Sequence, residues 1–400
     1  MALRRLTELT SAPFYWPIAA SLLFVGLGDA VSGPYVALFL TDKAELGPVA
    51  LGSLLTVRAI ASIAIGFAFG RWFDRAPSTT PLFLALGSGV AGYVILAFTT
   101  NYFVLMALVA VPMATAASAF PQLFALSKGH LDTRGASLAE SGVSLLRALW
   151  SVAWAAGPAV GAAIIIPFDF RGVFLATAAF AAASIAIVGF SGIRARVNAV
   201  STSPPRDSWL RAIRSAGFAA LALTLVWTAM FMGSVALSIS VTHTMGGTKQ
   251  DVGHAFSLCA FLEVIVMMGF VIRPVNTESR AWMSAGFAAF VIYFATIAVA
   301  PSVDIVLAAQ AIRAVAIGIV GCLGIGYCQA ILRGRVGGAT ALFANSVNAG
   351  ALLAGLGTGT WAEAFGYQSM FGACAGLSGL GLLLLQFQPR TSPPGPDNDH

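Results

Sequence analysis

The sequence predicts an all-α polytopic membrane protein with twelve transmembrane helices arranged as two six-helix pseudo-repeats. Of its 400 residues, 58% are hydrophobic and only 10% are charged, and the mean hydropathy is +0.86. A soluble domain of this length needs far more polar surface to cover its core. Apolar stretches long enough to cross a bilayer recur from Phe14 to Leu385, separated by short charged or Pro- and Gly-containing breaks.

Each predicted helix corresponds to one apolar stretch. In chain order the spans are 13–41, 49–72, 79–99, 102–128, 137–166, 170–193, 213–243, 250–272, 281–300, 303–332, 338–363 and 367–387. The longest polar segment, IRARVNAVSTSPPRDSWLRAIR, separates the sixth span from the seventh. The predicted organisation is an N-terminal six-helix bundle (1–193), a cytoplasmic linker (194–212), a C-terminal six-helix bundle (213–388) and a disordered tail (389–400).

Two local matches support an internal repeat. GASL at 135–138 and GATA at 338–341 each precede an odd-numbered span, at an offset of 203 residues. The fifth and eleventh spans then carry small residues four positions apart, at an offset of 198. These residues are Ala153, Gly157 and Gly161 in the fifth span, and Ala351, Gly355 and Gly359 in the eleventh. Small residues at this spacing let two helix backbones approach closely, so we expect them to serve in packing.

The distribution of cations predicts the orientation in the membrane. Sixteen of the twenty-two Lys and Arg residues fall on the side that holds both termini, and three (Lys43, Arg171 and Lys249) fall on the other. This is the positive-inside pattern, so a multi-pass protein of the cell (inner) membrane with both termini cytoplasmic is expected. The net charge of +6 reflects this topology and does not indicate a nucleic-acid partner.

No pattern in the sequence indicates a cofactor or a metal site. The four cysteines lie inside predicted spans and form no CxxC pair. His243 and His254, eleven residues apart near the outer ends of the seventh and eighth spans, are interpreted as interface residues. A Ser/His/Asp set and a phosphate-binding loop are also missing, so an enzyme is not expected. The partners expected are a small-molecule substrate, protons and the lipid bilayer, and a monomer is expected.

Five charged residues lie deep inside predicted spans: Asp29, Arg58, Arg147, Glu263 and Arg313. A charge at this depth is costly, so such side chains usually face a protein interior or an aqueous cavity. One interpretation is a set of structural ion pairs. The other assigns proton coupling to a carboxylate, since an acid can exchange its proton near neutral pH in such an environment whereas arginine stays charged. Asp29 and Glu263 are the proton-coupling candidates.

The fifth span has a polar stripe. Its members, at alternating spacings of four and three, are Glu140, Ser144, Arg147, Ser151, Trp154, Pro158 and Gly161. Gly157 adjoins this stripe. We expect the stripe to face a cavity between the two halves, with Arg147 directed away from lipid and Pro158 bending the helix. For Trp154 both packing and substrate contact stay open.

Neutral polar residues supply further candidates. Asn345 and Asn348, three residues apart in the eleventh span, offer amide donors and acceptors suited to hydroxyl groups. Gln122 follows Pro121 in the fourth span, and Gln310 shares a helix face with Arg313. The substrate-binding candidates are Arg58, Gln122, Arg147, Trp154, Arg313, Asn345 and Asn348, with helix–helix hydrogen bonding as the alternative role of the asparagines.

Several motifs resemble those of the major facilitator superfamily. GRWFDR at 70–75 resembles its loop motif in Gly70, Asp74 and Arg75, without the usual basic continuation. The Gly157-Pro158-x-x-Gly161 element resembles the motif of its exporters. FPQLFALSKGHLDTRG (120–135), GRVGGATALFANSVNAGALLAG (334–355) and FLEV (261–264) resemble its sugar efflux transporter family.

The resemblance implies export of sugars and glycosides in exchange for protons. By this resemblance, the residues that match positions recurring in the family's motifs are Gln122, Arg147, Glu263, Asn345 and Asn348. Arg58, Arg313 and Asp29 stand where neutral or small residues are expected, which allows an anionic or more polar solute. Because the helices carrying Arg147 and Glu263 pack together in this superfamily, we expect these side chains to approach each other.

Two alternatives stay open. A multidrug or other small-solute proton antiporter of the same superfamily would fit the element around Pro158. A non-transporting membrane receptor or scaffold would need a signalling domain, and no segment of the chain is long enough to supply one.

Overall fold

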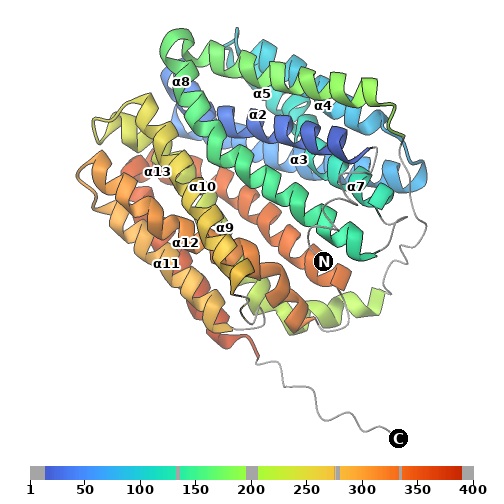
Figure 1. The fold of residues 1–400 in the computed structure, drawn as a ribbon. Coiled ribbons are helices and arrows are strands. Elements are labelled where there is room, and N and C mark those ends of the chain that lie inside the picture. The colour runs from blue at the N-terminus through green and yellow to red at the C-terminus, as the bar shows by residue number, and fades with distance from the viewer. Residues whose placement is uncertain are drawn as a thin grey trace, which may run out of the picture.

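The computed structural model describes residues 14–131, 136–194, 206–273, 275, 280–332 and 336–389. Every regular element in these ranges is a helix, and the helices form two packed groups (Figure 1). The all-α polytopic fold class is therefore confirmed.

The N-terminal half is built from α2 to α8. The bounds are α2 Tyr15–Asp42, α3 Pro48–Arg75, α4 Thr80–Leu96, α5 Tyr102–Ala110, α6 Pro112–Ala116, α7 Ala119–Leu131 and α8 Ala136–Ser191. Pro112 interrupts the helical backbone between α5 and α6 because it has no N–H to donate, so α5, α6 and α7 together form one membrane pass.

The C-terminal half is built from α9 to α13. The bounds are α9 Arg206–His243, α10 Lys249–Ile272, α11 Arg280–Ala298, α12 Val303–Ile331 and α13 Val336–Phe387. Helix α9 begins inside the segment predicted as a linker (194–212), while 195–205 and most of the predicted tail, 390–400, lie outside the described residues.

Two helices are too long for one crossing. Helix α8 has 56 residues and α13 has 52, about 80 Å at 1.5 Å per residue, against a hydrocarbon core of about 30 Å. Asp169 (φ 52°) breaks α8 and Gly366 (φ 78°) breaks α13. Nine helices in the described ranges are long and apolar enough to span a membrane, and Thr80–Leu96 is a shorter apolar helix. Dividing α8 and α13 at their breaks then gives twelve passes in this part of the chain.

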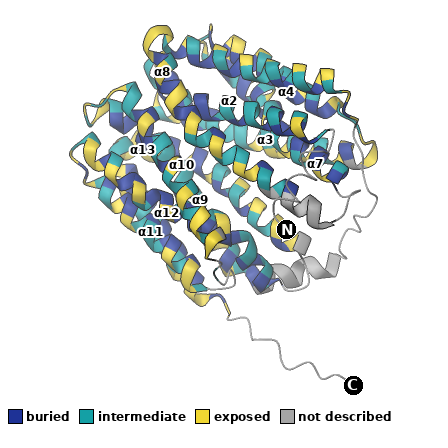
Figure 2. Ribbon diagram, viewed as in Figure 1, coloured by how far each residue is buried: buried dark blue, intermediate teal, exposed yellow. Residues whose placement is uncertain are grey.

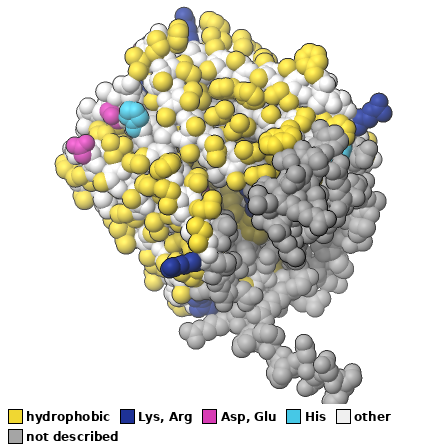
Figure 3. Space-filling view, viewed as in Figure 1, with side chains coloured by type: hydrophobic (Ala, Val, Ile, Leu, Met, Phe, Trp, Pro, Cys, Tyr) yellow, Lys and Arg dark blue, Asp and Glu magenta, His cyan; other side chains and the backbone are white. Residues whose placement is uncertain are grey.

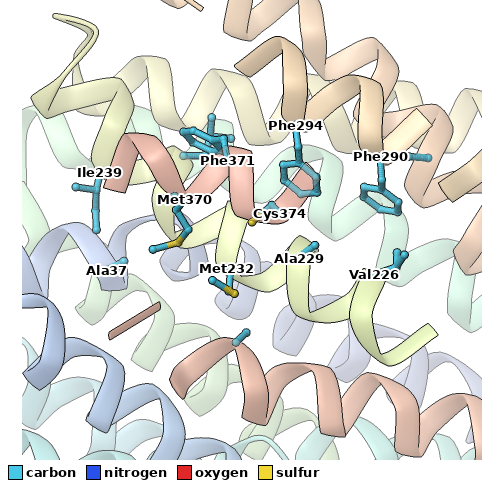
Figure 4. Packing of buried hydrophobic residues seen from close by; sticks show 14 of the residues in the cluster. Ala37, Val226, Ala229, Met232, Ile239, Phe290, Phe294, Met370, Phe371 and Cys374 are labelled. Carbon is cyan, nitrogen blue, oxygen red and sulfur yellow. The ribbon is translucent and has the colours of Figure 1, made fainter. Parts of the chain in front are cut away.

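The larger apolar cluster contains residues of both halves, and a second cluster lies within the N-terminal half. In the C-terminal half, Met232 of α9, Phe290 and Phe294 of α11, and Met370 and Phe371 of α13 lie together in the core (Figure 4). Buried residues concentrate on the helix faces turned toward neighbouring helices (Figure 2). The surface in Figure 3 is largely hydrophobic outside the grey region, with few charged side chains, as expected for a chain surrounded by lipid.

Candidate functional site

The two halves are joined by ion pairs at one end of the bundle, here called the Asp169 end. Lys43, at the end of α2, lies 3.0 Å from the Asp169 carboxylate, and Lys249, at the start of α10, lies 3.0 Å from its other oxygen. The Lys249 ammonium also lies 4.1 Å from the centre of the Phe170 ring. Asp42 and His243, one from each half, are 2.8 Å apart. The interpretation of His243 as an interface residue is confirmed.

Asp169 is held ionised by these contacts. Burial by itself raises the pKa of the Asp169 carboxyl, but hydrogen bonds from Lys249 and Lys43 outweigh burial, so the pKa lies below its usual value. The carboxylate therefore bridges two cations throughout the neutral pH range.

Close backbone contacts reinforce the same end. A methyl group placed on Gly52 of α3 would lie 2.5 Å from Gly359 Cα, and one on Gly355 of α13 would lie 2.7 Å from the Thr56 amide nitrogen. Glycine is required here because neither helix backbone can yield to a side chain. Between α8 and α10, Gly253 lies against the Tyr35 hydroxyl and the Pro158 carbonyl.

Farther from the Asp169 end, residues on the same faces of α3 and α13 are exposed and no longer pack against a helix of the other half. On α13, Asn348 and Asn345 follow Gly359 and Gly355 along one face, and both asparagines are exposed. On α3, Phe67 continues the face of Gly52 and Thr56 and is 66% exposed. The halves therefore touch at the Asp169 end and separate toward the other end, where the asparagine amides line the gap.

The N-terminal half holds a polar cluster beside this gap. Arg58 of α3 is the cation that acts on Asp29 of α2, and both side chains are partly buried. Ser32, one turn beyond Asp29, donates to the Tyr93 hydroxyl of α4 at 3.3 Å. The structure thus brings Asp29 and Arg58 together with Ser32 and Tyr93, which sequence reasoning did not select.

The C-terminal half holds a second polar cluster. Arg313 of α12 is only 5% exposed and donates to Ser234 of α9 at 2.7 Å and to Gln310 at 3.4 Å. Its guanidinium carbon lies 4.9 Å from the centre of the Phe256 ring. Arg313 is also the cation that acts on Glu263 of α10.

The expected approach of Arg147 to Glu263 does not appear as an ion pair among the described residues. Arg147 is exposed on α8, and the group of the other half on which its charge acts is the Cys322 thiol of α12. Glu263 has Arg313 in its own half as its nearest cationic influence. The four cysteines are free, and Cys322 is the exposed one.

Trp154 and Gln122 lie inside the N-terminal half. A methyl group on Gly33 of α2 would lie 3.4 Å from the Trp154 ring, and the indole N–H is buried without a hydrogen-bond partner in the described ranges. Gln122 is 5% exposed. The side chains of Glu140 and Ser144, predicted on the Arg147 stripe, lie outside the described residues.

The predicted packing glycines fall into two groups. Gly157 lies against Ala30, and Gly161 lies against Val31 and Tyr35, all on α2. Gly355 and Gly359 instead contact α3 of the other half. Around Gly70 there is open space, Arg75 is exposed, and the Asp74 side chain is not among those described.

One signal in the sequence could have located the Asp169 end. The cation count leaves Lys43, Arg171 and Lys249 on the side opposite the termini. Two of these three bind Asp169, and Arg171 lies over the Phe98 ring at 5.5 Å. The scarcity of charges on this side could therefore have pointed to these contacts, whereas Ser234 and Tyr93 carried no comparable signal.

Two helical halves that meet at one end, with polar groups lining the gap between them, define a membrane transport protein. Comparison with known proteins agrees. The model of the Major Facilitator Superfamily matches residues 18–332. A Deinococcus radiodurans protein named as a sugar efflux transporter is 34% identical, over 90% of this chain and 94% of its own length. Sugar efflux transporter C of Escherichia coli is 25% identical over 96% of this chain and 97% of its own.

Solved structures show the same fold. The nucleoside transporter NupG superposes with a TM-score of 0.75 at 12% identity, covering 94% of this chain and 99% of its own. The peptide transporter POT in complex with alafosfalin superposes with a TM-score of 0.72 at 13% identity, covering 94% of each chain. The chain belongs to the sugar efflux transporter family of the Major Facilitator Superfamily, and it is a secondary transporter rather than an enzyme.

Proposed function

We propose that this transporter exports sugars or small glycosides in exchange for protons, by alternating access of a site between its two halves. It acts as a monomer in the cell's inner membrane, with both termini cytoplasmic. The relatives named as sugar efflux transporters support the substrate class. The positive-inside distribution of cations supports the orientation.

The observation that carries the proposal is the position of Asn345 and Asn348. Both amides are exposed on the face of α13 that, farther along, packs through Gly355 and Gly359 against the other half. A solute bound to these amides lies between the halves. When the halves close at one end and open at the other, the bound solute becomes accessible from the opposite side of the membrane. Amides donate to and accept from hydroxyl groups, which matches a sugar.

The two deep carboxylates supply the proton-coupling candidates. Asp29 belongs to the N-terminal half and Glu263 to the C-terminal half, and each has one arginine of its own half acting on it. With the termini cytoplasmic, the Asp169 end is the outer end, so this conformation is closed to the outside and open toward the cytoplasm.

The test is counterflow in proteoliposomes that contain the purified protein. Vesicles loaded with an unlabelled solute should accumulate the same radiolabelled solute when it is a sugar or glycoside, and an imposed proton gradient should drive net accumulation. Uptake of a cationic drug with no uptake of any sugar would assign the protein to multidrug antiport instead. Absence of counterflow for every solute in the panel, with folded protein, would contradict the proposal.

A further inference from the structure

Arg313 is surrounded by neutral groups from four helices. This Arg313 cluster consists of Ser234 (α9), Phe256 (α10), Tyr293 (α11) and Gln310 (α12) around the guanidinium. The donor–acceptor distances are 2.7 Å to Ser234 Oγ and 3.4 Å to Gln310 Oε1. The rings of Phe256 and Tyr293 lie with their centres 4.9 and 5.8 Å from the guanidinium carbon. Buried cations are ordinarily paired with a carboxylate, and no such ion pair of Arg313 is found among the residues that the structure describes.

The candidate carboxylate partner of Arg313 is Glu263 of α10, on which the charge of the guanidinium acts. Phe256 and Glu263 are seven residues apart, on the same face and about 10 Å along the helix axis. Seated over Phe256, the guanidinium exerts its charge on Glu263 without an ion pair between these two described residues. Gly318 fixes the register of the two helices, because a methyl group there would lie 2.8 Å from Val266 of α10.

We propose that Ser234 is a positioning residue for proton coupling: it holds Arg313 off Glu263, so that the carboxylate stays free to bind and release a proton. The inference rests on the proposed proton exchange. Without the Ser234 acceptor, the buried guanidinium turns to the strongest acceptor within its reach, the Glu263 carboxylate. A direct ion pair would then hold that carboxylate in its charged form.

The hydroxyl of Ser234 both donates and accepts a hydrogen bond in this position. It donates to the Met230 carbonyl at 2.7 Å and accepts from Arg313. Gln310 is fixed in the same way, because its amide nitrogen donates to the Val306 carbonyl at 2.9 Å and leaves its oxygen directed at Arg313. Both acceptors are thus preorganised by the backbone of their own helices.

The other titratable groups around Glu263 come from its neighbouring helices. Cys259 shares α10 and interacts with both Glu263 and Arg313. Tyr293 of α11 interacts with Arg313. From α8, Arg147 acts on Cys322 of α12. From α2, the Tyr35 hydroxyl lies at Gly253, more than two turns from Glu263 along α10. Arg313 is therefore the cation whose position controls Glu263.

The experiment is the pH profile of proton-driven sugar accumulation in proteoliposomes. Ser234→Ala should move the half-maximal pH in the acid direction by about one unit, the equivalent of a tenfold change in proton affinity. Ser238→Ala is the matched control: it lies one turn along α9, it is buried whereas Ser234 is partly buried, and its hydroxyl donates to a backbone carbonyl of its own helix. Its profile should match the wild type. Ser234→Thr retains the hydroxyl and should restore the wild-type profile.

Two outcomes separate this inference from the proposed function. Glu263→Gln should remove the pH dependence, and a profile unchanged by Glu263→Gln would contradict proton coupling through this residue. If Glu263→Gln removes the dependence while Ser234→Ala and Ser238→Ala give the same profile, the role of Ser234 is refuted and the coupling stands. Should Ser234→Ala fail to fold, Gln310→Met removes the second acceptor, and its expected acid shift decides the question in the same way.

Discussion

At the scale of single residues, the polar groups are divided between the gap and the two halves. Asn345 and Asn348 are exposed in the gap, whereas Arg313 is buried in the C-terminal half and Gln122 in the N-terminal half. A residue reaches a solute only if its side chain lies on the face that opens. The asparagines therefore remain the proposed substrate contacts, and we propose that Arg313 acts on Glu263 instead.

Substitution of both Asn345 and Asn348 by leucine should abolish sugar transport while leaving expression intact. Both amides are exposed and have no hydrogen bond to another described residue, and leucine cannot donate to or accept from a hydroxyl group. Counterflow of labelled sugar and the amount of purified monomer measure the two effects. Unchanged transport kinetics in the double variant would assign both residues to helix packing.

Asp29→Asn should eliminate pH-driven accumulation and retain solute exchange at equal pH on both sides. Asparagine keeps the shape of the side chain and removes the titration, while Arg58 remains beside it. Accumulation and exchange measured in the same vesicles separate coupling from translocation. Loss of either carboxylate is expected to uncouple transport from protons, because each half supplies one coupling candidate. An Asp29→Asn variant that still concentrates sugar down a proton gradient would exclude Asp29 and leave Glu263 as the remaining candidate.

At the scale of helices, the packing contacts align the two halves at a different residue offset from the one that the glycine spacing in the sequence indicates. Gly157 of α8 lies against Ala30 of α2, and Gly357, one of several glycines of α13 that contact α9, lies against Met232. The equivalent offset is therefore 200 residues, which also relates Tyr93 to Tyr293, rather than the 198 that aligns Gly157 with Gly355. Gly355 has a separate function, since it joins α13 to the opposite half.

Gly355→Ala should lower transport at least tenfold. The added methyl group would meet the Thr56 amide nitrogen at 2.7 Å, and overpacking of this kind costs about 1–3 kcal/mol. The strain opposes only the conformation closed at the Asp169 end, so each half still folds. Gly372→Ala on the same helix, where the added methyl group meets nothing within 4 Å, is the control. Equal transport by the two variants would contradict the close approach of α13 and α3.

At the scale of the whole molecule, ion pairs link the two halves at the Asp169 end, and we expect closure to depend on them. Asp169 binds one lysine from each half, and Asp42 binds His243 across them. Because these side chains are partly exposed, each pair is worth little by itself. Their effect is on the balance between two states that differ by a few kcal/mol, where small contributions change populations.

Asp169→Asn should favour the state open at the Asp169 end and so slow maleimide labelling of Cys322, the exposed cysteine, from the opposite side. The lowered pKa of Asp169 gives the sign of the pH effect. The carboxylate stabilises the closed state above its unfolded pKa of about 3.9, and this stabilisation is lost as pH falls through the lowered pKa of the folded protein. The difference between wild type and variant should be constant from about pH 5 to 8, should decline as pH falls below about 4, and should disappear only below the lowered pKa of Asp169. Asp304→Asn, also at the start of a helix and exposed, is the control. Labelling at equal rates in all three proteins would contradict the role of Asp169.

The sequence by itself determined the class of this protein, because the bilayer permits few solutions to a chain with repeated apolar stretches of spanning length. It also identified the deep charges, whose cost in lipid makes them conspicuous. Only the tertiary structure decided which charge acts on which: Arg313 rather than Arg147 acts on Glu263, and Lys43 and Lys249 share Asp169. These pairings join residues that are 50 to 126 positions apart. No local pattern encodes them, because they follow from how helices pack within and between the halves.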